Sequence, residues 1–438
     1  MHMKTAKEKT TLRKISGTVA LSLVVANMIG TGIFTTTGLL IEDLGNPMVV
    51  LLAWLVGGIA ALAGALTYAE LGARMPQSGG EYLYLSKLYH PALGFVAAWI
   101  SLIVGFAAPV AAVAVAFATY LQSVFPGLSV ITTALLAVAA FSGLHLWSVK
   151  AGGTVQNIIT WLKVVLILGF ILGGLFMAAP ENSATVLSMT PDKDAIFSSV
   201  FASSLILVMY SYSGWNAAAY VGGEVKNPAK SLPLALVGGT LLVIAIYLAV
   251  NYMFLSSVPQ QIISGKVEAG HYVANEIFGN AGGNVVSLLI SGFLLSTLSS
   301  MIMAGPRVYK AVGEDYRLFR CLAKTSSTGA PYYAVLLQMA VAALLIVTFT
   351  FETILVYTGF TLSLFAGLTV GGLFILRKRF GKGKSYKNPA YPAAPVVFII
   401  ITLWMIVHAL VNQPMASIAG LATIAAGLLL YIVQKRFS

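Results

Sequence analysis

Long apolar stretches follow one another along almost the whole chain, separated by short polar segments. A helix needs about 20 mostly apolar residues to cross a bilayer, and about twelve stretches are suitable. They lie near residues 15–41, 47–71, 92–125, 129–146, 153–178, 196–221, 233–257, 284–307, 332–350, 353–376, 394–411 and 415–433. Strands of a membrane barrel alternate over about 10 residues, so they do not fit such continuous runs. The pattern predicts an all-α membrane protein with about twelve transmembrane helices.

The composition supports this interpretation and orients the helices. Of the residues, 58% are hydrophobic and 9% are charged, whereas soluble proteins carry about 25% charged residues. With a cytoplasmic N-terminus, Lys163, Lys193 and Lys266 are the only Lys or Arg residues away from the cytoplasmic side. This asymmetry predicts that both termini are cytoplasmic and that the protein lies in the cell membrane. It also explains the net charge of +12, so we expect a lipid bilayer and no nucleic acid as partner.

The chain contains no stretch long and polar enough for an appended soluble domain. We expect a cytoplasmic tail (1–14), a transmembrane core (15–376), a basic cytoplasmic loop (377–393), and helices 11 and 12 with a short C-terminal tail (394–438). Within the core, helices 1–5 and 6–10 are expected to be inverted repeats.

The first and sixth stretches contain glycine and hydroxyl residues near mid-membrane, at residues 27–34 and 210–216. Glycine costs about 1 kcal/mol relative to alanine inside a helix, and an unwound backbone at this depth is tolerated only where it lines a cavity. Helix packing through small residues is the alternative explanation. The matched positions, five spans apart, favour inverted repeats with a substrate site between two broken helices.

Two broken helices can bind a zwitterion without a charged side chain. The N-terminus of a half-helix carries about +0.5 of a charge and free N–H groups that bind a carboxylate. Unwound carbonyls nearby can accept from an ammonium group. No Asp, Glu or Arg falls in the predicted pocket, which favours neutral substrates, although aromatic rings can also hold cations.

Lys163 is the only charged residue deep in a predicted span. It lies about 15 Å from the inner end of the fifth span, where a charge costs about 2.5–3.5 kcal/mol or more. Snorkelling to the interface is one explanation. The functional alternatives are a proton carrier and a permanent cation that replaces a bound metal ion.

Other polar residues do not form a catalytic or metal-binding pattern. Cys321 is the only cysteine and the five histidines are scattered, so we expect no enzyme, metal site or cofactor. A channel would require a polar stripe or charge ring, which is not evident. Several charged residues at inner span ends either anchor the helices or form a gate of ion pairs: Glu70, Arg74, Glu81, Glu224 and Arg307.

Three stretches resemble the signatures of a known family: Gly-Thr-Gly-Ile-Phe at 30–34, the segment 68–82 after the second span, and the segment 214–233 at the end of the sixth. On these stretches the chain resembles the amino acid–polyamine–organocation (APC) transporters, especially the L-type amino-acid transporter branch. The resemblance extends over nearly the whole chain. It implies a LeuT-like fold with two inverted repeats of five helices, in which helices 1 and 6 are broken.

The resemblance also implies roles for individual residues. Gly30, Thr31 and Gly32 would present N–H groups to the substrate carboxylate. The residues that would supply carbonyls to the amino group or shape the pocket are Asn27, Met28, Ile29, Tyr210, Ser211, Ser213, Trp215 and Asn216. Lys163 would occupy the place of a sodium ion in sodium-dependent relatives, near the Gly30 region and Ser299 or Ser300.

Four residues are candidates for gates. Tyr210 falls where relatives carry a gating aromatic residue, and Glu70 with Arg74 would form an inner gate. Many relatives have an aromatic residue in the middle of the tenth span, where this chain has Ser363, with Phe360 one turn earlier. Phe360 is therefore the fourth candidate.

These observations predict a sodium-independent secondary transporter of neutral L-amino acids that works by alternating access, as an exchanger or a proton symporter. The partner would be a small amino-acid substrate, and the chain would act as a monomer with no accessory subunit indicated. A transporter of cationic amino acids or polyamines is the alternative on the same fold. An amino-acid-binding membrane sensor without transport is the alternative of another class.

Overall fold

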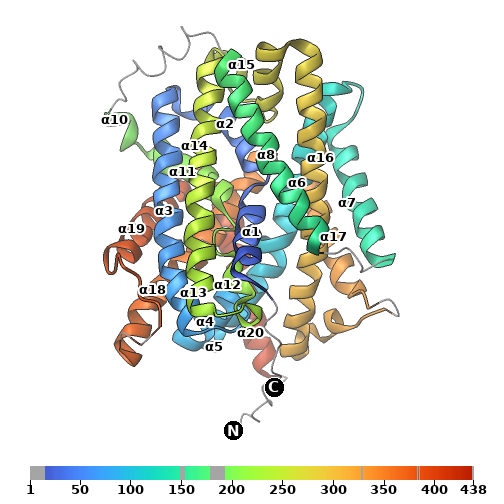
Figure 1. The fold of residues 1–438 in the computed structure, drawn as a ribbon. Helices are drawn as coiled ribbons and strands as arrows, with labels where there is room; N and C mark the ends of the chain where they lie inside the picture. The colour runs from blue at the N-terminus through green and yellow to red at the C-terminus, as the bar shows by residue number, and fades with distance from the viewer. Residues whose placement is uncertain are drawn as a thin grey trace.

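The computed structural model describes residues 15–147, 153–177, 193–326, 329–381, 383 and 385–436. The expected cytoplasmic tail, 1–14, therefore lies outside the described residues. Figure 1 shows a bundle of upright helices in which α1 begins and α20 ends at the same end. We call this end the terminal side of the molecule, and the other end the opposite side.

The described elements are helical. In chain order they are α1 (Gly17–Met28), α2 (Gly32–Leu44), α3 (Pro47–Arg74), α4 (Gly80–Leu88), α5 (Pro91–Ile100), η1 (Ser101–Ala107), α6 (Ala108–Val124), α7 (Val130–Trp147), α8 (Gly153–Met177), α10 (Lys193–Ile196), α11 (Ser199–Tyr212), α12 (Ala217–Tyr220), η2 (Gly222–Glu224), α13 (Pro228–Pro233), η3 (Leu234–Gly238), α14 (Gly239–Ser257), α15 (Gln260–Ile263), α16 (Ala269–Asp315), η4 (Arg317–Ala323), α17 (Tyr332–Thr348), α18 (Phe351–Phe380), α19 (Ala393–Asn412) and α20 (Pro414–Arg436). The helix α16 is bent at Gly279, whose φ is 71°.

The predicted spans agree with this architecture. In the described part of the chain, 10 helical segments are long and apolar enough to cross a membrane, and α11 and α17 are shorter apolar helices. Each predicted span overlaps one of these segments. The tenth span continues to Phe380, beyond position 376, so the expected start of the basic loop is helical.

Side-chain caps set where several helices begin. The Ser16 hydroxyl accepts from the Val19 N–H at the start of α1, and the Asn46 amide oxygen accepts from Met48 and Val49 at the start of α3. Ser198 caps α11 in the same way. Such caps satisfy N–H groups that have no carbonyl one turn earlier. They therefore fix the helix ends at polar turns between the apolar stretches.

Both predicted breaks are present. The first span unwinds over residues 29–31, between α1 and α2, and the sixth over residues 213–216, between α11 and α12. Gly214 has a φ of 101°, a conformation that favours glycine because it has no Cβ. Figure 1 shows α1 and α12 toward the terminal side, and α2 and α11 toward the opposite side.

The halves of the two broken helices pack pairwise. The helix α2 packs against α11, and α1 packs against α12. The two breaks therefore meet inside the bundle, where α3 and α14 also pack against the broken helices. This places two unwound stretches of main chain side by side.

Candidate functional site

The two breaks touch through positions where only glycine fits. A Cβ built on Gly32 would lie 2.3 Å from Ser211 Oγ and 2.6 Å from Ser211 Cα. A Cβ on Gly214 would lie 2.8 Å from the main-chain carbon of Asn27. The residues expected at the site therefore come together, and close approach of the two backbones explains Gly32 and Gly214. At Gly30 the nearest atom to such a Cβ is 4.0 Å away, so that position has space beside it.

Hydroxyl groups join the two broken helices on the side of α2. The Tyr210 hydroxyl lies 3.2 Å from Thr31 Oγ1, and Ser211 Oγ lies 2.9 Å from Thr36 Oγ1. Ser211 Oγ also donates to the Leu207 carbonyl over 2.8 Å. The aromatic residue expected as a gate is thus bonded to Thr31, the last unwound residue before α2.

A residue that sequence reasoning missed connects the carbonyls of the two breaks. The Tyr247 hydroxyl, from α14, donates to the Met28 carbonyl and lies 3.0 Å from the Ser211 carbonyl oxygen. These are two of the carbonyls expected to accept from a substrate ammonium group. A tyrosine inside an apolar span carried no signal of this role, because its contacts depend on which face of α14 meets the breaks.

Exposure differs between the two sides of the breaks. Asn27 is exposed, and Gly30, Ser213 and Gly214 are partly exposed. On the opposite side, Thr31 through Ile41 are buried. In that part of α2, a Cβ on Gly38 would lie 2.0 Å from the Lys266 carbonyl oxygen. The structure is therefore closed on the opposite side and more open toward the terminal side.

Trp215 and Asn216 form the far edge of the second break. The Trp215 ring is buried, with its centroid 4.7 Å from that of Tyr68 and 5.8 Å from that of Phe398. The Asn216 amide nitrogen donates to Glu81 Oε1 over 2.7 Å. Glu81 was expected only as an anchor or gate at a span end, and the structure instead places its carboxylate directly behind the second break.

Lys163 is buried, with 5% of its surface exposed, so it does not snorkel to the interface. Its ammonium donates to Thr297 Oγ1 over 2.8 Å. Ser299 lies elsewhere, 3.0 Å from His145 Nε2, and Ser300 Oγ donates to the Ser296 carbonyl. The expected partner hydroxyl thus needs correcting from Ser299 or Ser300 to Thr297. Successive helix residues differ by about 100° in direction, so spacing alone did not identify the correct one.

Glu70 is the centre of an ion-pair network on the terminal side. Its carboxylate is fully buried and lies 3.4 Å from Arg74 Nη1 and 2.5 Å from Arg377 Nη2. It also accepts from the Asn388 main-chain N–H over 2.8 Å. The Arg377 guanidinium stacks 3.7 Å above the Tyr391 ring. The stronger partner is Arg377 rather than the expected Arg74, and the network joins α3 to α18 and to the segment before α19.

Phe360 does not lie where a gate requires it. A Cβ on Gly420 of α20 would be 2.9 Å from the Phe360 ring, so this ring packs between α18 and α20. Gly359 instead contacts α11, with a Cβ position 2.7 Å from the Ile206 carbonyl oxygen. Ser363 lies one turn later on that same face. The face of α18 toward the broken sixth span is therefore small and polar.

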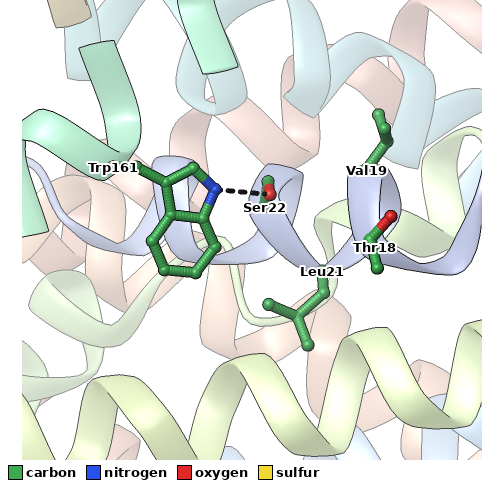
Figure 2. A pocket seen from close by; sticks show the side chains of 5 residues that line it. All are labelled: Thr18, Val19, Leu21, Ser22 and Trp161. Atoms are coloured by element: carbon green, nitrogen blue, oxygen red, sulfur yellow. Dashed lines mark hydrogen bonds between the residues drawn. The ribbon is translucent and has the colours of Figure 1, made fainter. Parts of the chain in front are cut away.

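A recess of about 180 Å³ lies beside α1 and α8, away from the breaks. Its lining residues are Thr18, Val19, Leu21, Ser22 and Trp161. Figure 2 shows the Trp161 indole pointing at Ser22, to which its Nε1 donates over 3.1 Å. This bond fastens α1 to α8 two residues before Lys163.

Comparison with known proteins identifies the family. The amino acid permease family model matches residues 15–433. The serine/threonine exchanger SteT of Bacillus subtilis is 30% identical over 95% of this chain and 95% of its own length. The human large neutral amino acids transporter small subunit 2 is 28% identical over 96% of this chain and 80% of its own. The mouse b(0,+)-type amino acid transporter 1 is 27% identical over 94% and 85%.

The matching span architecture, the two broken helices and the family match agree with one another. The fold is the LeuT-like arrangement of an all-α, multi-pass membrane protein. Its relatives are carriers and not enzymes. The chain belongs to the amino acid permease family, within the APC superfamily, on the side of its L-type amino-acid transporter branch.

Proposed function

We propose that this protein exchanges neutral L-amino acids across the cell membrane by alternating access. The observation that carries this proposal is the meeting of two unwound segments whose polar groups are main-chain atoms and hydroxyls. The free N–H groups at the start of α2 suit a carboxylate. The carbonyls of Met28 and Ser211 suit an ammonium group, which would take the place of the Tyr247 hydroxyl. The predicted site residues keep the roles expected from the sequence, except Phe360, Ser299, Ser300 and Gly30. The Gly30 N–H donates to the Met28 carbonyl over 2.9 Å, so the N–H groups of Thr31 and Gly32 would bind the carboxylate.

A neutral side chain is favoured by the groups around the second break. Ser213 and Tyr210 are uncharged, and the Glu81 carboxylate is occupied by its own donors. A cationic side chain would require a free carboxylate, which none of these residues provides. Two relatives, named as a serine/threonine exchanger and a transporter of large neutral amino acids, support the same substrate class and, for the first, exchange.

Independence from sodium follows from the position of Lys163 in this proposal. Its ammonium, held by Thr297 between α8 and α16, supplies a fixed positive charge where an ion would otherwise bind. Exchange then requires no proton, whereas proton symport requires Lys163 to lose one. A Lys163→Ala variant distinguishes the two: a pH profile that the substitution leaves unchanged excludes the lysine as proton carrier.

Uptake into proteoliposomes tests the function. The purified protein would be reconstituted with and without internal amino acid, and labelled L-threonine, L-leucine, L-phenylalanine and L-arginine would be offered outside. We expect saturable uptake of neutral amino acids that depends on internal amino acid and is the same in sodium and choline buffers. No saturable uptake of any of them, with binding retained, would instead support a sensor, and preferred uptake of L-arginine would support the cationic alternative.

The same proposal places both termini in the cytoplasm and treats the single chain as the transporting unit. The orientation rests on the concentration of Lys and Arg on the terminal side. The domain division expected from the sequence also remains a proposal, with helices 1–5 and 6–10 as the inverted repeats. Reconstitution of this chain alone tests whether an accessory subunit is needed.

A further inference from the structure

A buried carboxylate lies directly behind the second break. Glu81, in the first turn of α4, is 8% exposed. Its Oε1 accepts from the Tyr68 hydroxyl over 2.8 Å and from the Asn216 amide nitrogen over 2.7 Å. Its Oε2 accepts from the Tyr220 hydroxyl. Three donors from α3 and from the second broken helix therefore converge on one side chain of α4.

These donors make the buried carboxylate tolerable. Burying a carboxylate without partners is costly, and hydrogen bonds to its charged form offset that cost. Burial raises the pKa of Glu81 above its ordinary value, and the bonds from Tyr220, Tyr68 and Asn216 act in the opposite direction. The donors are thus a condition for holding a charge here, which explains why three of them surround one side chain.

The bond to Glu81 fixes how the Asn216 amide is turned. An asparagine amide offers a donor NH₂ and an acceptor oxygen, and its hydrogen-bond network decides which faces which way. Here the NH₂ group is bound by the carboxylate. In the described part of the chain, no hydrogen bond reaches the Asn216 amide oxygen, and the residue is partly exposed. Asn216 therefore presents an acceptor at the edge of the break.

The same carboxylate supports Trp215 indirectly. Tyr68 donates to Glu81, and its ring meets the Trp215 ring at 77° with centroids 4.7 Å apart. The loop before α4 is also tight against α12, because the Gly79 N–H donates to the Tyr220 carbonyl over 3.1 Å. Glu81 thus supports both of the last residues of the second break: it bonds to Asn216 directly and contacts Trp215 through Tyr68.

We propose that Glu81 is a positioning residue of the amino-acid site, which sets Asn216 with its amide oxygen as an acceptor for a donor group of the solute. This rests on the proposed function only for the class of solute. A glutamine at position 81 would offer an NH₂ group in place of one oxygen, which allows the Asn216 amide to turn over. The site would then present a donor where the solute also has a donor.

A binding measurement on purified protein tests this proposal. The dissociation constant of labelled L-threonine or L-leucine, whichever the unmodified protein binds more tightly, would be measured for Glu81→Gln. We expect a rise of about tenfold, the size of a lost hydrogen bond to a charged group. In the Asn216→Ala background the same substitution should cause no further rise. Additive effects of the two substitutions, or an unchanged dissociation constant, would overturn the proposal.

Two controls separate positioning from general damage. Glu314→Gln removes an exposed carboxylate on α16, paired with Lys310 over 3.7 Å, and should leave binding unchanged. If Glu81→Gln cannot be purified, Glu81→Asp keeps the charge but withdraws it by one methylene from Asn216. That variant should raise the dissociation constant about threefold, and only when Asn216 is present. No rise with Glu81→Asp would equally overturn the proposal.

Measuring binding and transport separately distinguishes a failure of the proposed transport function from a failure of the proposed role of Glu81. A protein that binds an amino acid without transporting it would refute the proposed transport, and the Glu81 test would still stand. A protein that transports normally while Glu81→Gln binds as tightly as the unmodified chain would refute the role of Glu81 alone.

Discussion

The Tyr247 hydroxyl lies 3.0 Å from the Ser211 carbonyl oxygen, and it also donates to the Met28 carbonyl across the two breaks. One side chain of α14 therefore occupies the acceptors that the proposed mechanism assigns to the substrate ammonium group. Its single proton can satisfy only one carbonyl at a time. An arriving ammonium group, with three donors, can satisfy both.

Removing this hydroxyl should change amino-acid binding without unfolding the protein. Tyr247→Phe leaves the ring in its packing against Trp54, 5.3 Å between centroids, but takes a donor from the buried Ser211 carbonyl. The Met28 carbonyl still accepts from the Gly30 N–H over 2.9 Å. Because the ammonium group would replace the hydroxyl at these carbonyls, the lost bond destabilises only the empty site, and we expect amino acid to bind about tenfold more tightly. Equilibrium binding to the purified protein would measure this, and an unchanged dissociation constant would mean that the Ser211 carbonyl finds another donor and that Tyr247 is not part of the site.

Substitution of Gly32 should lower thermal stability, whereas substitution of Gly30 should weaken amino-acid binding. Gly32→Ala places a Cβ 2.3 Å from Ser211 Oγ, so the two broken helices must separate and the protein should lose thermal stability. Gly30→Val meets no atom closer than 4.0 Å at the Cβ. It should therefore fold, yet bind amino acid at least about tenfold more weakly by blocking the carboxylate. Thermal unfolding with and without amino acid separates the two effects. Normal binding by Gly30→Val would mean that the first break serves only packing.

The sequence was sufficient to predict the fold because the features that define a membrane span can be read along the chain without knowing the packing. The length of an apolar stretch and the glycines inside it determine a span and a break, so both broken helices were predicted at the right residues. The partner of Lys163 was not, because Thr297 and Ser299 differ by a rotation on α16 rather than by hydropathy. The contacts of Tyr247, Glu81 and Arg377 were not predicted for the same reason.

Glu70 and Arg377 illustrate how a long-range pair escapes sequence analysis. The pattern placed Glu70 beside Arg74, one helical turn away, since neighbours on a helix are the pairs that spacing reveals. The shorter contact is with Arg377, more than three hundred positions later in the chain. Only the packing of α18 and α3 brings these groups together.

Removing Arg377 should therefore lower the stability of the protein more than removing Arg74. Arg377→Ala leaves a fully buried carboxylate with its closest cation gone, which costs about 3–5 kcal/mol when a buried pair is broken. Arg74→Ala removes a contact of 3.4 Å and should cost much less. Thermal unfolding in detergent would rank them. A larger loss for Arg74→Ala would show that the local pair is the important one.

Cys321 offers a direct test of orientation. It is the only cysteine in the sequence and is exposed at the end of η4, on the terminal side. If both termini are cytoplasmic, a membrane-impermeant maleimide should not label intact cells but should label permeabilised cells fully. Cys321→Ser provides the background signal. Labelling of intact cells at the same level would invert the proposed topology.

Thr297 should matter more than its neighbouring hydroxyls if Lys163 provides the fixed charge. Thr297→Val keeps the shape of the side chain but removes the acceptor 2.8 Å from the ammonium, which leaves a buried charge without that partner. We expect the exchange rate to fall about tenfold, because a hydrogen bond to a charged group contributes about 1.5–3 kcal/mol. Ser299→Ala, which removes a group bonded to His145, should lower the rate less than about twofold, since it leaves the ammonium untouched. Equal losses in the two variants would show that the bond to Thr297 is not what holds the Lys163 charge during transport.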